Sequence, residues 1–268
     1  MKQDLNRATS QTIADFGDQW TAYTRNDGFY ASQEMLRDIL GPLVSEEELS
    51  GKVCAEVGAG TGRISQMLLR AGAAHVTAIE PSKAREVLAR NLSAYGDRVA
   101  VLGEAGETFE LSGLDFILSI GVLHHIPEPS GTVRNMHRSL TAGGRAVIWL
   151  YGREGNRAYL ALAQPLRWIT RRLPLWVNTA LAAVLYPPLA TYISLCRILP
   201  LPMRKYMLEV LRPIGGKAIR LVIVDQLNPR WAKYYTESEA RNLLAEAGFH
   251  DIQLHHRHGY SWTVSGRR

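Results

Sequence analysis

The feature that most limits the fold is a regular alternation of short apolar runs and amphipathic helical segments between residues 52 and 151. The apolar runs have the length and composition of buried strands and lie at 53–57, 75–80, 98–102, 114–120 and 145–151. The helical segments lie at 63–72, 82–96 and 129–140. Strands that alternate with helices predict a parallel sheet with right-handed crossover connections.

The C-terminal part of the chain predicts one more helix and a hairpin. Thr236 and Glu239 have the spacing of a capping box, and the helix that they begin ends at Gly248. Two strand-like runs, DIQLHH and YSWTVSG, follow so closely that they favour an antiparallel hairpin at the sheet edge. The predicted fold class is therefore α/β, with a doubly wound, seven-stranded, mostly parallel sheet.

Four parts follow from this pattern. We expect a helical cap at 1–50, an α/β core at 51–151, a helical insertion at 152–230 and a C-terminal helix and hairpin at 231–268 that complete the core. The two cysteines lack the paired spacing of a zinc site or a disulfide framework, and the polar start of the chain lacks the apolar core of a secretory signal. Both observations favour a cytoplasmic protein.

The insertion at 152–230 carries most of the positive charge. It holds twelve Lys or Arg residues against three acidic residues, while the whole chain has a net charge of +6. The stretch from Leu173 to Cys196 has no charge of either sign, but Pro174, Pro187 and Pro188 argue against a straight spanning helix. The pattern predicts two short amphipathic helices. Residues 155–208 then form either a substrate lid or a peripheral contact with the inner, anionic membrane face.

A glycine-rich loop follows the first strand. Glu56, Gly58, Gly60 and Gly62 alternate with small residues, where the backbone must approach a ligand closely. Arg63 stands where a dinucleotide-binding loop requires glycine, and no Lys followed by Ser or Thr closes a phosphate-binding loop. Glu80 ends the second strand, eighteen residues after Gly62, where a carboxylate can accept hydrogen bonds from both hydroxyls of a ribose.

These stretches together resemble the class I methyltransferases that use S-adenosylmethionine, particularly bacterial enzymes of small-molecule, glycan or lipid pathways. The resemblance rests on VCAEVGAGTGR, AIEPS, the GEA at 103–105, LDFILSIGVLHHIPEP and RSLTAGGRAVIWLYG. It implies S-adenosylmethionine as cofactor and a Rossmann-like methyltransferase fold. The implied cofactor-binding residues are Glu56, Gly58, Ala59, Gly60 and Gly62 at the methionine part, Glu80 and Pro81 at the ribose, Glu104 and Ala105 at the adenine, and Ile120 and Gly121 beside the sulfonium.

Methyl transfer from a sulfonium is an in-line displacement, so the protein chiefly positions an acceptor and excludes water. His124 and His125 follow the fourth strand, and either is a candidate catalytic base for a hydroxyl acceptor, with His125 preferred. The alternative is that both histidines only shape the loop. Phe16 and Trp20 lie one helical turn apart and either close over the cofactor or pack against the domain.

A metal site is not expected. His255, His256 and His258 alternate along a strand without an acidic or cysteine partner at ligand spacing, which predicts a solvated strand end.

The resulting functional prediction is O-methylation of a small or lipid-linked acceptor. The run SIGVLHH replaces the Asn-Pro-Pro-aromatic run that accompanies methylation of nucleic-acid bases, so nucleic acid is an unfavoured partner. Two alternatives stay open: a non-catalytic scaffold of the same fold that docks to membranes, and an RNA methyltransferase that uses the basic insertion. The sequence does not determine the oligomeric state.

Overall fold

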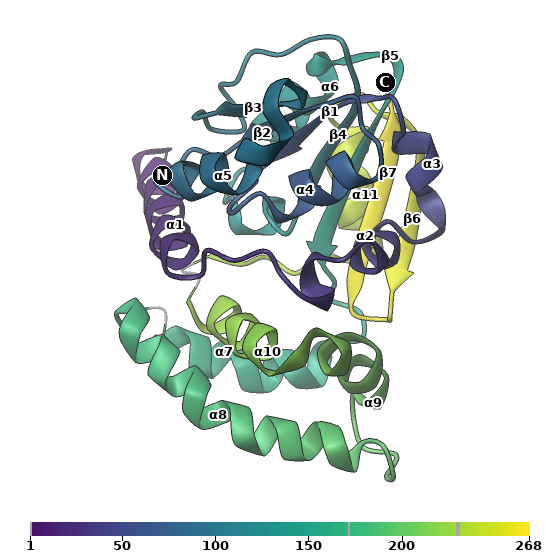
Figure 1. Ribbon diagram of the computed structural model, residues 1–268. Coiled ribbons are helices and arrows are strands. Elements are labelled where there is room, and N and C mark those ends of the chain that lie inside the picture. The colour runs from purple at the N-terminus through teal and green to yellow at the C-terminus, as the bar shows by residue number, and fades with distance from the viewer. Residues whose placement is uncertain (1, 171, 229–230) are drawn as a thin grey trace.

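The computed structural model describes residues 2–170, 172–228 and 231–268 and contains a seven-stranded sheet (Figure 1). The strand order is β3-β2-β1-β4-β5-β7-β6, and β7 is the strand that runs antiparallel to both of its neighbours. The bounds are β1 Val53–Val57, β2 His75–Ile79, β3 Val99–Leu102, β4 Leu114–Ile120, β5 Leu140–Tyr151, β6 His250–Arg257 and β7 Ser261–Arg267. The predicted α/β class, the mostly parallel sheet and the C-terminal hairpin are confirmed.

Strand β1 lies inside the sheet and pairs in parallel with β2 on one side and β4 on the other. The chain moves outward from β1 through β2 to β3, then returns to β4 and continues in the opposite direction. In an open α/β sheet the crevice outside the carboxyl ends of the strands, at the point where the order reverses, is where ligands bind. The topology therefore directs attention to the segments that follow β1 and β4.

Helices cover both faces of the sheet (Figure 1). Cys54 belongs to a core shared with apolar residues of α2, α4 and α5, whereas Ala55 and Val57 belong to a second core shared with α6 and α11. This alternation follows from the two-residue period of a strand. The helices are α2 Gln33–Leu40, α4 Arg63–Arg70, α5 Arg85–Leu92, which η3 Ser93–Arg98 extends, α6 Ser130–Ser139 and α11 Glu237–Ala245.

The N-terminal cap is helical, as predicted. It consists of α1 Lys2–Ala22, η1 Phe29–Ala31, α2, η2 Gly41–Leu43 and α3 Glu46–Leu49. Arg145 of β5 fastens this cap to the sheet, because its guanidinium donates to the Glu48 carboxylate, the Leu43 carbonyl and the Ser265 hydroxyl. The predicted capping box of α11 is also present, since Thr236 and Glu239 each accept the other's backbone N–H.

The insertion lies below the carboxyl ends of the strands in Figure 1. It comprises α7 Arg157–Thr170, α8 Leu175–Leu195, α9 Arg204–Tyr206, η5 Met207–Leu211 and α10 Arg212–Leu227. The short helix η4 Leu123–His125 belongs to the core and follows β4. Residues of α8, η5 and α10 join the core that contains α2, so the insertion and the cap share one apolar interior.

The prediction of two short amphipathic helices between the prolines is wrong. Helix α8 continues for 21 residues through Pro187 and Pro188. Each proline removes one backbone donor, but packing of α8 against α10 maintains the helix. Among the described residues, no helix is both long enough and apolar enough to cross a membrane.

The three C-terminal histidines do not form a solvated strand end, so that prediction is also wrong. His256 stacks on Trp262 with ring centroids 4.1 Å apart, and His255 packs against Gly41. His258 lies between two carboxylates: its Nε2 is 2.6 Å from Asp38 Oδ1 and its Nδ1 is 2.7 Å from Glu209 Oε2. Because Asp38 lies on α2 and Glu209 on η5, this histidine connects the hairpin, the cap and the insertion.

A stability prediction follows from Gly62, which precedes α4. Its φ is +84°, and an added Cβ would lie 2.7 Å from Cδ1 of Leu88, which is fully buried. Gly113→Ala is the matched control, because Gly113 has φ +76° but no atom within 4 Å of an added Cβ. We expect Gly113→Ala to lower the free energy of unfolding by about 1 kcal/mol and Gly62→Ala to lower it by a further ~1–3 kcal/mol.

Urea unfolding of the wild type and the two variants measures these differences. Equal losses in the two variants would show that the contact with Leu88 is unimportant.

Candidate functional site

A cavity of about 570 Å³ lies at the carboxyl ends of the strands, between the glycine-rich loop, α1 and the insertion. Its size is within the range of small-molecule sites. One end is lined by the loop after β1 and the acidic residues that follow β2 and β3, and the other by aromatic and apolar residues of β5, α7, α8 and α10. The cavity therefore joins a polar end to an apolar end.

The glycine-rich loop forms the wall of the polar end. Gly58 has φ +77°, and an added Cβ would lie 2.4 Å from Cγ2 of Val122, which follows β4. The N–H groups of Gly58 and Ala59 both donate to the Ile79 carbonyl at 2.9 Å, which holds the loop against the end of β2. Only glycine fits at position 58, because that close approach excludes any side chain.

Gly62 has a different position from the other loop residues. It does not line the cavity but stands at the start of α4, against Leu88 and Leu92. Its predicted contact with the methionine part of a cofactor stays a prediction.

Glu56 and Glu80 are two buried carboxylates that line the polar end. Glu56 accepts hydrogen bonds from the backbone N–H of Ser65, at 2.8 Å, and from its hydroxyl. Burial raises the pKa of Glu56 to about 8, although Ser65 and the nearby Arg63 oppose that shift. Glu80 accepts from the N–H of Gly60 at 2.8 Å and from the N–H of Ser82 at 2.9 Å.

The remaining residues that the sequence assigned to a cofactor also line the cavity. They are Ala59, Gly60, Pro81, Glu104, Ala105, Ile120 and Gly121. The structure thus brings together segments from the ends of β1, β2, β3 and β4.

His125 lines the cavity next to the apolar end. Its Nδ1 lies 2.9 Å from the Trp231 carbonyl, so Nδ1 carries a proton, and Nε2 is buried without a hydrogen-bond partner among the described residues. Burial lowers the pKa of His125, and the nearby Asp225 opposes that shift. The neutral imidazole therefore presents a lone pair at Nε2.

His124 is placed differently. It is fully buried, lies outside the cavity lining, and stacks on Tyr151 with ring centroids 3.8 Å apart. Burial lowers its pKa well below the usual value, so it is neutral. A ligand in the cavity does not reach His124, and the structure therefore separates the roles of the two adjacent histidines.

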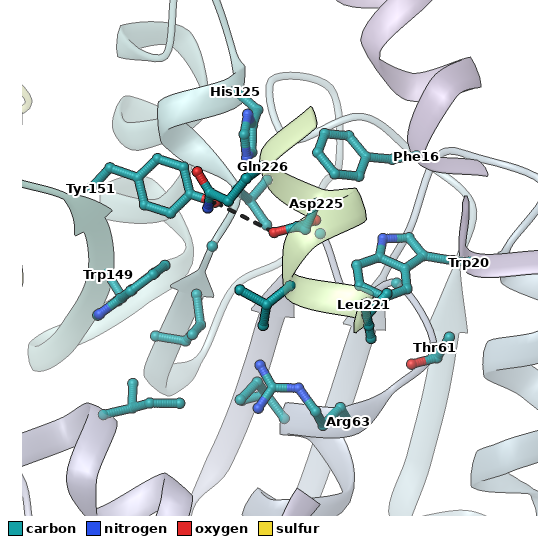
Figure 2. Close-up of a pocket in the computed structure, with 18 of the residues that line it drawn as sticks. Phe16, Trp20, Thr61, Arg63, His125, Trp149, Tyr151, Leu221, Asp225 and Gln226 are labelled. Atoms are coloured by element: carbon teal, nitrogen blue, oxygen red, sulfur yellow. Dashed lines mark hydrogen bonds between the residues drawn. The ribbon is translucent and has the colours of Figure 1, made fainter. Parts of the chain in front are cut away.

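Sequence reasoning missed Asp225 and Gln226 of α10, which line the cavity beside Tyr151. The Gln226 side chain donates to the Tyr151 hydroxyl at 2.9 Å and accepts from the Tyr159 hydroxyl at 2.7 Å and from Arg167 at 3.0 Å. Figure 2 shows the two side chains extending from α10 between Tyr151 and the aromatic residues of α1. The available signal was an acidic residue inside the apolar run LVIVDQL.

Helix α1 closes the cavity from the other side. The Phe16 ring lies 4.8 Å from the His125 ring, and Trp20 contacts the position that a Cβ on Gly60 would take. Gln19, between them, donates to Asp225 at 2.9 Å. Helix α1 therefore contacts both the glycine-rich loop and the insertion (Figure 2).

The described residues contain no group of three or more His, Cys, Asp or Glu side chains that could hold a metal ion.

Comparisons with known proteins agree with this geometry. Residues 55–146 match the family model described as a methyltransferase domain. A ubiquinone biosynthesis O-methyltransferase of Aromatoleum aromaticum is 30% identical over 130 residues, which cover 47% of this chain and 55% of the relative. A probable histone-arginine methyltransferase of Arabidopsis thaliana is 32% identical over 122 residues, which cover 44% of this chain and 20% of the relative.

The fold has a counterpart of nearly the same length among solved structures. The S-adenosylmethionine-dependent methyltransferase of Mesorhizobium loti aligns with a TM-score of 0.51 at 18% identity and covers 89% of this chain and 98% of that one. The chain spans about half the length of the O-methyltransferase relative. Residues 55–146 are therefore similar to a methyltransferase domain, and the strand order is that of the same fold.

A pH prediction follows from the raised pKa of Glu56. The folded protein keeps the Glu56 proton up to about pH 8, whereas the unfolded chain releases it near pH 4.5, the ordinary pKa of a glutamate. The folded state binds more protons in this window, so the contribution of Glu56 to the free energy of unfolding falls as the pH rises through it. Glu56→Gln keeps the shape but has no proton to lose.

We expect the free energy of unfolding to decrease less between about pH 5 and about pH 8 in Glu56→Gln than in the wild type. Urea unfolding at both pH values measures this difference, with the exposed Glu110→Gln as the matched control. Identical pH dependence in Glu56→Gln and the wild type would contradict the raised pKa.

Proposed function

We propose that this chain transfers a methyl group from S-adenosylmethionine to a hydroxyl oxygen of an amphiphilic acceptor, either a small molecule or a lipid-linked one. The observation that carries the proposal is that His125 lines the cavity and that its Nε2 has no hydrogen-bond partner among the described residues. The family supplies the reaction class, and the cavity supplies the reason for an oxygen acceptor.

The polar end fits the cofactor. Gly58 presents bare backbone to this end of the cavity, and the Glu80 and Glu104 carboxylates line the same end. We infer that Glu80 accepts from the ribose hydroxyls, Glu104 and Ala105 contact the adenine, and Glu56 with Gly58 and Gly60 surrounds the methionine part. S-adenosylmethionine, when bound, supplies an electrophilic methyl group on a positively charged sulfur.

Two residues outside the predicted set add to this fit. Arg63 lines the cavity and provides a cation for a carboxylate, while Trp20 covers Gly60. The glycine-rich loop and helix α1 would then enclose the cofactor and exclude water.

His125 acts as the general base in this proposal. Its Nδ1–H donates to the Trp231 carbonyl, which fixes the ring with Nε2 as the acceptor, and its lowered pKa keeps the ring neutral near pH 7. The acceptor O–H bond breaks as its proton moves to Nε2, and the oxygen becomes the nucleophile. Asp225 lies close enough to stabilise the imidazolium that forms.

The apolar end sets the acceptor class. Leu166 and Leu185 line the cavity and are also 41% and 37% exposed, so the cavity is open to the surface of the insertion between apolar side chains. Tyr151, Asp225 and Gln226 supply polar atoms deeper in the same cavity. An acceptor with a hydroxylated head and an apolar tail satisfies both regions. The relative named as an O-methyltransferase supports oxygen as the acceptor atom.

The cofactor assignment predicts the effect of Glu80→Gln. This change removes the charge of the carboxylate at constant size, and hydrogen bonds to charged groups are worth ~1.5–3 kcal/mol. We expect the affinity for S-adenosylhomocysteine to fall by roughly 10- to 100-fold. Isothermal titration calorimetry measures this loss, with Glu110→Gln as the control. Wild-type affinity in Glu80→Gln would remove the ribose assignment.

The base assignment predicts the effect of His125→Asn. We expect kcat to fall by about 10²- to 10⁴-fold while the affinity for S-adenosylhomocysteine stays unchanged. Transfer of labelled methyl from S-adenosylmethionine to alkyl-chain catechols and to hydroxylated lipids measures kcat, and the exposed His250→Asn is the control. If His125→Asn kept its turnover and its pH profile, His125 would not be the base and would serve only to shape the loop.

A further inference from the structure

The outer face of α8 is exposed over the full length of the helix and has no charged side chain. Its exposed positions recur every three or four residues along one side of the helix, at Trp176, Thr179, Ala180, Ala183, Val184, Pro187, Pro188, Thr191, Ser194 and Leu195. Trp176 is 73% exposed and Val184 is 71% exposed, and Ile198, directly after the helix, is 78% exposed. A surface helix of a water-soluble domain ordinarily places charged residues on this side.

Exposed basic residues flank α8 in the chain. Arg172 precedes α8 and lies over the ring of the exposed Trp168 at 5.2 Å, and Arg197 follows the helix. Arg204 and Lys205 of α9 are also exposed. No acidic residue occurs between Gly155 and Leu208, so no negative charge in this stretch opposes contact with an anionic surface.

The position of α8 suits a planar partner. It lies on the side of the insertion away from the sheet (Figure 1), and its 21 residues extend over about 30 Å. The opening of the cavity belongs to the same region, because Leu185 of α8 and Leu166 of α7 are both exposed and both line the cavity.

We propose that the outer face of α8, with Trp168 and Ile198, docks flat on the surface of an anionic phospholipid membrane. The apolar side chains enter the boundary between headgroups and acyl chains, and Arg172, Arg197, Arg204 and Lys205 contact the phosphates. The basic rim favours this occupant over a second copy of the chain, since two copies would bring like charges together.

Flotation of the full-length protein with vesicles tests the proposal. We expect the wild type to float with vesicles of phosphatidylcholine and phosphatidylglycerol, to float weakly with phosphatidylcholine alone, and to lose binding as salt increases. The assay contains no cofactor or acceptor, so its result is independent of the proposed methyl transfer.

Two double variants separate the apolar and charged contributions. We expect Trp176→Ser with Ile198→Ser to weaken vesicle binding on the order of tenfold or more, and Arg172→Glu with Arg197→Glu to weaken it on the order of thirtyfold or more. Arg90→Glu with Arg134→Glu is the matched control, because both arginines are exposed on helices of the core. Circular dichroism confirms that each variant is folded.

Absence of wild-type flotation would overturn the proposal, as would equal flotation of the control and the two test variants. Light scattering identifies the competing occupant: a dimer that Trp176→Ser with Ile198→Ser converts to a monomer would assign the face to a second copy of the chain.

Discussion

The close approach of the loop after β1 to the segment after β4 is the constraint on which the rest of the site depends. Gly58 passes so near Val122 that no side chain fits between them. This contact occurs at the point where the strand order reverses, so the ends of β1 and β4 border one cavity. The acidic residues after β2 and β3 reach the same space because parallel strands end at the same edge of the sheet.

The insertion supplies the part of the cavity wall that the sheet does not. Helix α10 places Asp225 and Gln226 opposite Tyr151, and Gln19 of α1 donates to Asp225. The cap and the insertion are also joined away from the cavity, through His258 between Asp38 and Glu209. The cavity is therefore covered by helix α1 and the insertion, which contact each other and the end of β5.

Much of the core was predictable from local patterns. The strand at 114–120 and the helix that Thr236 begins were expected at or near their observed bounds, because strand length, capping residues and glycine stops act over a few residues. The same reasoning failed at Pro187 and Pro188, where packing against α10 maintains α8. It also failed at His258, whose two carboxylate partners lie on distant segments.

The sequence by itself determined the alternation of strands and helices, the glycine loop with its later carboxylate, and the charge asymmetry of the insertion, since all three depend on residue type and spacing. Only the tertiary structure decided which of two adjacent histidines faces the cavity. It also decided that Gly62 packs against Leu88 instead of lining the cavity, and that Asp225 meets Tyr151. These outcomes depend on contacts between segments far apart in the chain, and such contacts leave no local pattern in the sequence.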